Sequence, residues 1–312
     1  MTKVNLPITG ICSFAKCPIA QNLETLEADF GVLGVPYDVG VGFLSGTRFG
    51  PRRIREASTQ YSRGGAGFYD PERGETYLAA PIRIVDCGDA DIVTGDIDAS
   101  FANIESAVRA IAERGVVPAV MGGDHSISIP VARALSNKGP LEVVHFDAHL
   151  DWSRGPATQR YSNGTPLRHM STMAHITGMT QVGMRGMGSS TREDFEEAKA
   201  WGSRIITCRE AMAMGAEAAM AQVPGGAKYY VSIDIDSLDI TTAPGTGSPM
   251  PGGFSFNQLL DMLEALSRKG EIVCFDLVEV APQYDPAGIT PRIAALIMLY
   301  FMGFIRKRQL GG

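Results

Sequence analysis

The chain has 312 residues, of which 45% are hydrophobic and 20% charged, and this suffices for one large globular domain or two smaller ones. Its formal net charge of −6 at pH 7, without any patch of basic and aromatic residues, disfavours nucleic acid as a partner. The 5 cysteines are scattered and form no C-x-x-C pair, which disfavours a disulfide scaffold and indicates reduced thiols in a cytoplasm.

The first 27 residues contain no charged region followed by an apolar one, so they predict no signal peptide but an N-terminal arm. From residue 28 to residue 312, short apolar runs alternate with longer helical patterns. In chain order the runs are FGVLGV, VVPAVM, LEVVHF, MTQVGM, KYYVSI and EIVCFDLV. Because these runs are apolar on both faces, they predict strands of a parallel sheet that helices cover on both sides.

Apolar residues at helical spacing predict helices over 100–114, 127–135, 192–201, 255–268 and 291–305. The most apolar stretch, 293–305, is shorter than the roughly 20 residues that span a membrane, so we expect a buried C-terminal helix and no membrane partner. The sequence contains no internal repeat and no linker between regions of different composition. It therefore predicts a single α/β domain with a doubly wound, mostly parallel sheet over residues 28–312.

Candidate metal ligands follow three of the predicted strands. They are His125 in MGGDHS, Asp147, His149 and Asp151 in VVHFDAHLDW, and Asp234 and Asp236 in YYVSIDIDSLD. In an extended chain, residues at i, i+2 and i+4 point to the same side. Ligands bind beyond the carboxyl ends of parallel strands, so the glycine-rich stretches 40–50, 122–123, 183–188 and 245–253 should border the same crevice. A lone D-x-D is usually a turn, but the joint set indicates a metal site.

The chemistry of this set indicates two metal ions. Carboxylates and imidazoles suit Mn²⁺, Fe²⁺, Ni²⁺ or Co²⁺ better than a structural Zn²⁺ site rich in thiolates. Four neighbouring carboxylates repel one another unless cations balance them, and two divalent ions provide that balance. Such a pair of ions can share a water and lower its pKa toward neutrality, which supports hydrolysis. We expect His145 to pack behind the ligands and Asp124 to cap the helix that follows it.

The ordered motifs GGDHS, HFDAHLD, SIDIDSLD, APGTGSPMPGG and LVEVAPQYD resemble those of the ureohydrolases, the family of arginase, agmatinase, guanidinobutyrase and proclavaminate amidinohydrolase. The resemblance begins near Ala28, includes VPYDVGVGFLSGTRFGPRRIREAS and reaches the C-terminus. APGTG and VEVAPQYD favour the agmatinase-like branch over arginase. The resemblance implies a three-layer α-β-α fold, a binuclear manganese cluster, with nickel or cobalt as alternatives, and hydrolysis of a guanidino group to urea and an amine.

The resemblance also implies residue roles. Asp147 and Asp234 would bridge the two metals, with His125 and Asp151 completing one site. His149 and Asp236 would complete the other. The residue Glu279, in LVEVAP, matches the glutamate that pairs with the substrate guanidinium. By the same analogy, Asp236 would accept a proton and pass it toward the leaving amine.

Departures from the family pattern leave the substrate open. Asn163 stands where family members usually carry a histidine thought to shuttle protons, so His169 or a water would replace it, unless the leaving amine is easy to protonate or the catalyst is weakened. Leu150 and Trp152 replace smaller residues beside the ligands. Trp152 would either stack on a cationic guanidine or pack in the core. The segment 152–163 would line the pocket mouth with Ser153, Arg154, Arg160 and Tyr161.

These mouth residues give conflicting indications. Arg154 favours a guanidino acid such as guanidinobutyrate, whereas Trp152 with Leu150 favours guanidine or an N-substituted (methylated or biguanide) guanidine. Agmatine is the remaining substrate that the family suggests. Two other readings stay open: a single-metal enzyme like the zinc deacetylases, and a weakly active or inactive subunit that assembles with an active homologue. The resemblance implies a homo-oligomer, trimer or hexamer, in which the N-terminal arm could reach a neighbour.

Overall fold

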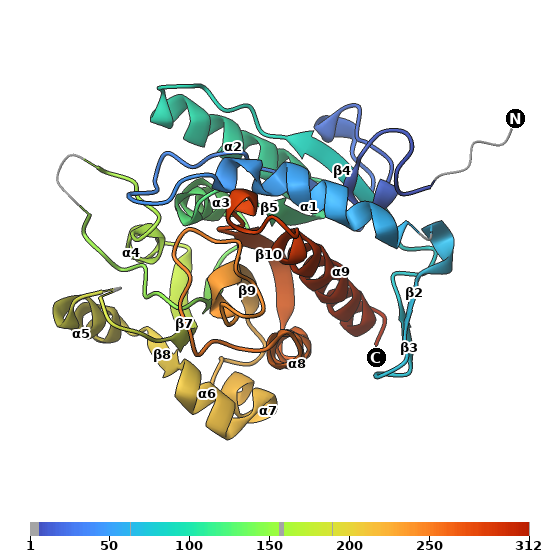
Figure 1. Ribbon diagram of the computed structural model, residues 1–312. Helices are drawn as coiled ribbons and strands as arrows, with labels where there is room; N and C mark the ends of the chain where they lie inside the picture. The colour runs from blue at the N-terminus through green and yellow to red at the C-terminus, as the bar shows by residue number, and fades with distance from the viewer. Residues whose placement is uncertain (1–5, 63, 156–158, 189, 312) are drawn as a thin grey trace, which may run out of the picture.

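The computed structural model describes residues 6–62, 64–155, 159–188 and 190–311. Its centre is an 8-stranded sheet with the strand order β4-β1-β5-β10-β9-β6-β7-β8, in which every neighbouring pair is parallel. Helices lie on both faces of this sheet, so the molecule has three layers (Figure 1). The predicted three-layer α-β-α fold with a doubly wound sheet is therefore confirmed.

The strands of the sheet are β1 (Phe30–Gly34), β4 (Ile84–Asp89), β5 (Val117–Met121), β6 (Leu141–Phe146), β7 (Ile176–Met184), β8 (Arg204–Thr207), β9 (Lys228–Asp234) and β10 (Glu271–Val278). A separate antiparallel hairpin consists of β2 (Phe68–Asp70) and β3 (Glu75–Tyr77). All the predicted strands are present. The sequence does not predict the two edge strands, β4 and β8, because they are only partly buried and lack a continuous apolar run.

The helices are α1 (Gly50–Ser58), α2 (Ile97–Glu113), α3 (Ser128–Ala134), α4 (Pro166–Met170), α5 (Arg192–Trp201), α6 (Cys208–Met214), α7 (Ala216–Ala221), α8 (Phe256–Ser267) and α9 (Ile289–Gln309). The predicted segments correspond to α2, α3, α5, α8 and α9, with ends shifted by a few residues at most. The start of α8 is fixed by Ser255, whose side chain accepts from the backbone of Gln258 while the Gln258 side chain accepts in return.

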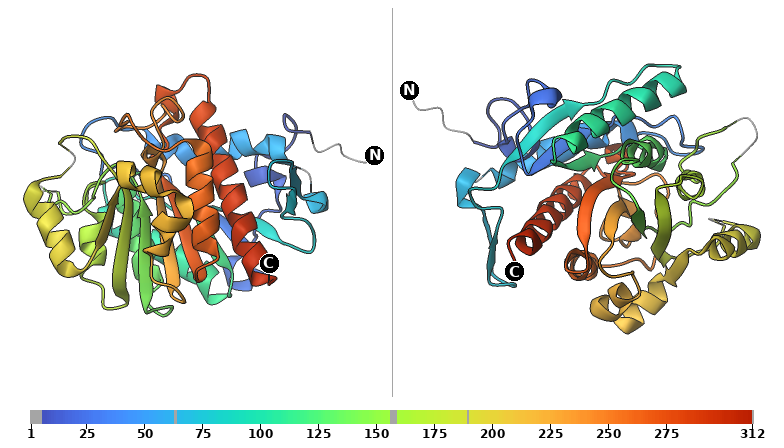
Figure 2. Two further views of the ribbon diagram at one scale, coloured as in Figure 1. Left: turned by 90° about the horizontal axis from the view of Figure 1, so that it is seen from below. Right: turned by 180° about the vertical axis from the view of Figure 1, so that it is seen from behind.

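Two hydrophobic cores, one on each face of the sheet, hold the layers together. Figure 2 shows these layers from two further sides. Ile233 and Leu277 pack with residues of α1, α8 and α9. On the same two strands, Tyr230 and Val278 pack with residues of α2 and α3. Because successive side chains of a strand point to opposite faces, a strand covered on both sides must be apolar at nearly every position. This burial is the reason why the runs in the sequence are continuous rather than alternating.

Helix α9 is longer than the apolar stretch 293–305 on which its prediction rests. Among the described residues it is the one helix whose length and composition would also allow it to cross a membrane, but 67% of its apolar window is buried inside the protein. It packs along α1 and α8. The burial of α9, and not its length, identifies it as a core helix.

Part of the N-terminal arm lies against the domain. Phe14 is fully buried, and its backbone N–H donates to Asp86 Oδ2 at 2.7 Å. The next residue, Ala15, donates its N–H to Ser58 Oγ at 2.7 Å. Residues 6–12 are exposed. The arm is thus fixed on its own domain from about Ser13 onward, while the residues before it lie on the surface.

The sheet order brings together the strands that carry the candidate ligands. β5, β10, β9 and β6 are consecutive neighbours in the middle of the sheet, and all are parallel. Their carboxyl ends therefore meet at the same edge, where ligands bind in open α/β sheets. Segments from four distant parts of the sequence consequently supply one site.

Candidate metal centre

His125 follows β5 in a turn that approaches the segment after β1 closely. A Cβ atom on Gly123 would lie 2.0 Å from the backbone oxygen of Tyr37, so only glycine fits there. The carboxylate of Asp124 then accepts a hydrogen bond from the backbone of Ser126 at 2.8 Å, which is the capping role predicted for it. This local geometry leaves His125 buried at the edge of the sheet.

Asp147, His149 and Asp151 meet in a turn and not in an extended chain. Strand β6 ends at Phe146, and Asp147 Oδ1 accepts from the backbone N–H of His149 at 2.6 Å. Asp151 has a φ of 54°, which lies in the left-handed region. The extended backbone predicted for positions i, i+2 and i+4 is therefore wrong, although the three side chains do lie close together.

Asp234 and Asp236 repeat this arrangement one strand away. Asp234 is the last residue of β9, and its Oδ1 accepts from the backbone N–H of Asp236 at 2.8 Å. Aspartates commonly form such turns two residues along the chain. Asp236 Oδ1 also accepts from the backbone of Ala148 at 3.1 Å. The loops after β6 and β9 are thus joined at the site itself.

The ring of His125 faces carboxylates from two loops. Its Nδ1 lies 3.0 Å from Asp151 Oδ2 and 3.1 Å from Asp147 Oδ2. Asp234 Oδ2 lies 3.2 Å from the same nitrogen. Nevertheless, Nδ1 is a buried atom without a hydrogen bond to any described group. A buried imidazole nitrogen that faces three carboxylate oxygens but donates to none of them fits the ligand shell of a cation.

A second group of donors adjoins the first. His149 Nδ1 lies 3.0 Å from Asp236 Oδ2 and 3.3 Å from Asp147 Oδ1. The ligand atoms of these three residues are close enough to hold one ion. Since the other oxygen of Asp147 lies beside His125, one carboxylate belongs to both groups. The structure therefore brings together all the residues predicted as metal ligands.

The electrostatics of the cluster also require cations. Burial raises the pKa of Asp234 and Asp236, and neighbouring carboxylates raise both further. Burial also acts to raise the pKa of Asp147, but its imidazole neighbours hold it well below the usual range. For His125, burial lowers the pKa and the carboxylates outweigh this, so that it lies well above 6.5. Without cations the site would have to bind protons, whereas two divalent ions balance its charge.

His145 lies beside the cluster but outside the cavity. By distance it could join His125, Asp147 and Asp151 around an ion. Its Nε2, however, is bonded to Asp147 Oδ2 at 2.8 Å, and its Nδ1 lies 3.3 Å from the side-chain nitrogen of Gln181. Histidine in this position orients a ligating carboxylate, which is the packed role predicted for it.

A buried hydrogen-bond network holds His125 from behind. His125 Nε2 lies 2.9 Å from Ser232 Oγ, which donates to Asp276 Oδ1 at 2.7 Å. Ser128 Oγ donates to the other oxygen of Asp276 at 2.7 Å, and Tyr230 also donates to it. This network was not predicted from the sequence. Its signal is an acidic residue inside the otherwise apolar run EIVCFDLV, where a charge is tolerated only with partners.

Glu279 follows β10 and borders the same cavity. Its Oε1 accepts from the backbone N–H of His125 at 2.8 Å, while its Oε2 is buried without a hydrogen-bond partner among the described groups. Burial, and then the nearby carboxylate of Asp124, raise the pKa of Glu279 to about 8. An unpaired carboxylate oxygen at the wall of a cavity is suited to a cationic ligand.

The cavity at the cluster has a volume of about 250 Å³. Its described lining consists of His125, His149, Asp151, Asn163, Gly164, Gly188, Asp234, Asp236, Ser248 and Glu279. Asn163 thus faces the cavity as predicted from its place in the family motif, and its backbone N–H is bonded to Gly40 O at 3.1 Å. Gly188 and Ser248 come from glycine-rich stretches expected at the crevice, although neither was predicted as a site residue.

Two residues expected at the mouth pack in a hydrophobic core instead. Trp152 is only 1% exposed, and its ring centroid lies 5.9 Å from that of Trp201. The ring of Tyr161 lies 4.7 Å from that of Phe101, and its hydroxyl accepts from Arg133 at 3.1 Å. Neither residue lines the cavity, which corrects their expected role in substrate binding. Of the two alternatives for Trp152, its burial supports packing.

Arg154 and His169 also lie away from the cavity lining. The Arg154 side chain is 73% exposed and lies 3.3 Å from Glu197. His169 Nε2 lies 3.0 Å from the backbone oxygen of Arg160, and burial lowers the pKa of this imidazole. The proposal that His169 replaces the proton shuttle at Asn163 therefore has no support in this geometry.

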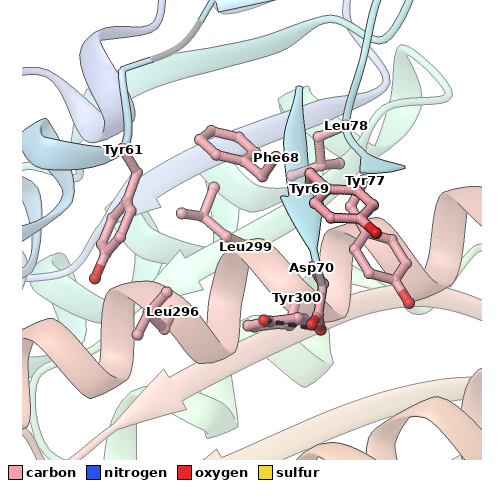
Figure 3. Close-up of a pocket in the computed structure, with 9 residues that line it drawn as sticks. All are labelled: Tyr61, Phe68, Tyr69, Asp70, Tyr77, Leu78, Leu296, Leu299 and Tyr300. Carbon is pink, nitrogen blue, oxygen red and sulfur yellow. Dashed lines mark hydrogen bonds between the residues drawn. The ribbon is translucent and has the colours of Figure 1, made fainter. Parts of the chain in front are cut away.

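A larger cavity of about 340 Å³ lies far from the metal cluster, between α9 and the β2–β3 hairpin (Figure 3). Most of its lining is apolar or aromatic, and it includes Tyr61, Phe68, Tyr69 and Tyr300. Its one lining carboxylate, Asp70, is already bonded by the Tyr300 hydroxyl at 3.0 Å. This cavity lacks the convergent polar groups that a catalytic site needs, so its size does not make it the functional site.

Comparison with known proteins agrees with this site. A model of the arginase family matches residues 28–303, and the chain belongs to this family. It is an enzyme of the ureohydrolase class, which acts on linear amidines, and not a member of the deacetylase class. Guanidinobutyrase of Pseudomonas aeruginosa is 34% identical over 299 residues, which cover 93% of this chain and 90% of that protein. Agmatinase of Bacillus subtilis is 36% identical over 296 residues, covering 92% and 96%.

The fold comparison leads to the same family. The solved structure of proclavaminate amidino hydrolase from Streptomyces clavuligerus matches with a TM-score of 0.83 and 31% identity, covering 96% of this chain and 99% of that one. A hypothetical agmatinase from Burkholderia thailandensis matches with a TM-score of 0.85 and 29% identity, covering 98% and 94%.

Proposed function

We propose that this enzyme hydrolyses a guanidino compound to urea and an amine with the help of two divalent metal ions. The observation that carries the proposal is the convergence of four aspartates and two histidines in one cluster, five of whose members line the cavity, with the unpaired oxygen of Glu279 at the cavity wall. The similarity to proteins named guanidinobutyrase and agmatinase supports the same reaction.

His125 and Asp151 would hold one ion, His149 and Asp236 the other, and Asp147 and Asp234 both. The distances around the two imidazole Nδ1 atoms support this division for Asp147, which lies beside both histidines. For Asp234 they support the site of His125, and its place in the second site rests on the family resemblance. We propose Mn²⁺, with Ni²⁺ or Co²⁺ as alternatives, because the donors are oxygen and nitrogen atoms without any thiolate. Ions bound there supply the Lewis acidity that makes water nucleophilic near neutral pH.

Glu279 binds and orients the substrate. A guanidinium is a planar cation with several N–H donors, and a carboxylate is its best-matched partner. The free Oε2 of Glu279 supports this pairing, while the bond from its Oε1 to the His125 backbone fixes the carboxylate relative to the metal ligands. The guanidinium carbon is thereby held beside the cluster, which lowers the entropic cost of the attack.

Asp236 moves the proton. It borders the cavity, and its Oδ1 is already engaged by the backbone of Ala148. Its carboxylate accepts the proton released when water adds to the guanidinium carbon and passes it to the leaving amine. Asn163 cannot take part in this transfer, because an amide does not titrate near neutral pH. It orients the substrate by hydrogen bonds from the cavity wall.

Two substrate classes remain for the reaction. The first is agmatine or a guanidino acid such as 4-guanidinobutyrate, as the relatives' names suggest. The second is guanidine or an N-substituted guanidine, including a methylated guanidine or a biguanide. Asn163 also supports a second function, that of a weakly active subunit in a hetero-oligomer with a homologue.

If the chain is active by itself, we propose that it forms a homo-oligomer, a trimer or hexamer. We also propose that it is cytoplasmic, which the 5 free cysteines support.

Urea release by the Mn²⁺- or Ni²⁺-loaded protein tests the reaction, and metal analysis of the same sample tests the cofactor. We expect about two ions per chain and turnover of at least one guanidino compound. Asp236→Asn should retain the protein fold and lose turnover. Intact turnover in that variant with both metals bound would contradict the role of Asp236, whereas one ion per chain would contradict the binuclear centre.

A further inference from the structure

We propose that the substrate carries a small uncharged substituent on its guanidino group, or none, and not a charged tail. This inference rests on the proposed function and specifies its substrate class. It follows from the charges around the cavity. Once two divalent ions balance four aspartates and the guanidinium pairs with Glu279, the remaining described lining is Asn163, Gly164, Gly188 and Ser248, and all four are uncharged.

No lysine or arginine lines the cavity among the residues that the structure describes. A carboxylate tail would consequently lose water without gaining a cationic partner, which is costly in a confined site.

The arginines of the segment after Asp151 are committed to other partners. Arg168 forms two hydrogen bonds of 2.6 Å to the carboxylate of Glu197, and Arg154 lies 3.3 Å from the same group. The guanidinium of Arg160 lies 4.8 Å from the ring centroid of Tyr161. None of these three arginines is among the described lining residues of the cavity.

Arg185 lies close to the cluster, and its guanidinium donates hydrogen bonds to backbone oxygens. Its Nη2 donates to the backbone oxygens of Asp236 and Met250, both at 2.7 Å. A further bond reaches Leu238 O at 3.1 Å. Its guanidinium therefore joins the loops after β7 and β9 and is not available to a substrate carboxylate.

Exposed apolar side chains stand next in sequence to residues at the cavity. Met187, next to the lining residue Gly188, has an exposed fraction of 95%. Val39 adjoins Gly40, whose oxygen accepts from the backbone of Asn163, and it is 51% exposed. Two bound metal ions would occupy part of the cavity of about 250 Å³, which would leave less room for the substrate. Both features suit a hydrogen or a small alkyl group.

The test compares kcat/KM for urea release by the metal-loaded, full-length protein on two sets of substrates. Guanidine, N-methylguanidine and N,N-dimethylguanidine form the first set, whose substituents are absent or uncharged. 4-Guanidinobutyrate, 3-guanidinopropionate and agmatine form the second set, with charged tails. We expect kcat/KM for the best substrate of the first set to exceed kcat/KM for every substrate with a charged tail by about 100-fold. A tailed substrate that matches or exceeds it overturns the inference and leaves the reaction intact. Silence on all six, with two metals bound, overturns both.

A cation placed at the mouth should change this selectivity. Ser248 is an exposed lining residue, so Ser248→Arg adds a charge without disturbing the core, and Ser248→Met adds similar bulk without charge. The ratio of kcat/KM for 4-guanidinobutyrate to that for N-methylguanidine should rise about 10-fold in Ser248→Arg and stay the same in Ser248→Met. An unchanged ratio in a folded, metal-loaded Ser248→Arg protein contradicts the inference.

Discussion

Two carboxylates of the site sit on strained backbone. Asp151 and Glu279 have φ values of 54° and 65°, a region that costs residues other than glycine on the order of 1–3 kcal/mol. Each is held there by its neighbours: Glu279 N–H donates to Gly123 O at 2.9 Å, and Asp151 O accepts from Leu167 at 3.1 Å. Such strain persists only where the surroundings fix it, so these side chains are positioned by the backbone before any substrate binds.

Replacement of Glu279 by Gln tests its pairing with the guanidinium. Glutamine keeps an acceptor for the His125 backbone but loses the charge, so we expect two bound metals and a fall in kcat/KM of roughly 100- to 1,000-fold. Urea release and metal content measure this. The matched control is Glu271→Gln, at the exposed start of the same strand. Wild-type turnover in the Glu279→Gln protein would show that the guanidinium binds elsewhere.

The network behind His125 should set the affinity for metal. Asp276→Asn keeps the size of the side chain but turns one oxygen into a donor among three hydroxyl groups that donate to it. We expect metal affinity to fall by about 10- to 100-fold, as for other groups that orient ligands. A chelator competition with Co²⁺, followed by its absorption spectrum, measures the affinity. The exposed Asp261→Asn is the control. Equal affinities and spectra would reduce Asp276 to a packing role.

At the scale of elements, the site is built from four loops that follow adjacent parallel strands. Short turns at the strand ends place the ligands: Asp147 and Asp234 each accept the backbone N–H two residues on. Arg185, from the loop after β7, then binds backbone oxygens of residues 236–238 and of Met250 in the loop after β9. The loops are thus joined to one another as well as to their strands, which limits the movement of the ligands.

The variant Gly123→Ala tests how closely the turn after β5 must approach the segment after β1. An alanine Cβ there would overlap the backbone oxygen of Tyr37, and backbone atoms can move little, so we expect a loss of about 1–3 kcal/mol in the free energy of unfolding and weaker metal binding. Gly225→Ala, where a Cβ would meet nothing within 4 Å, is the matched control. Denaturant unfolding of both proteins decides, and equal stabilities would contradict the close approach.

At the scale of the whole molecule, the two cores hold a cluster of like charges at the edge of the sheet. Hydrophobic burial on both faces keeps the strand ends together although the aspartates repel one another. The metal ions should therefore contribute to stability as well as to catalysis, because they bind the folded chain and remove this repulsion.

Chelation should lower the melting temperature. An ion present at about 1,000 times its Kd stabilises the fold by roughly 4 kcal/mol, so removal of both should shift Tm by several degrees or more. Calorimetry with a chelator, followed by return of Mn²⁺, measures the shift. A double variant with His125→Ala and His149→Ala should melt at a temperature that the chelator does not change. If the chelator left the Tm of the wild-type protein unchanged, the ions would not be part of the folded structure.

The sequence by itself determined the central strands and indicated the candidate metal ligands that the structure brings together. The strands are buried on both faces, so local apolar runs reveal them, and the ligands occur in short motifs whose residue types have few other uses. Tertiary structure alone decided the edge strands, which are half exposed, and the direction of the side chains after Asp151. Trp152 and Tyr161 pack in a core while Asn163 faces the cavity, because contacts with Trp201 and Phe101, distant in sequence, fix their orientation.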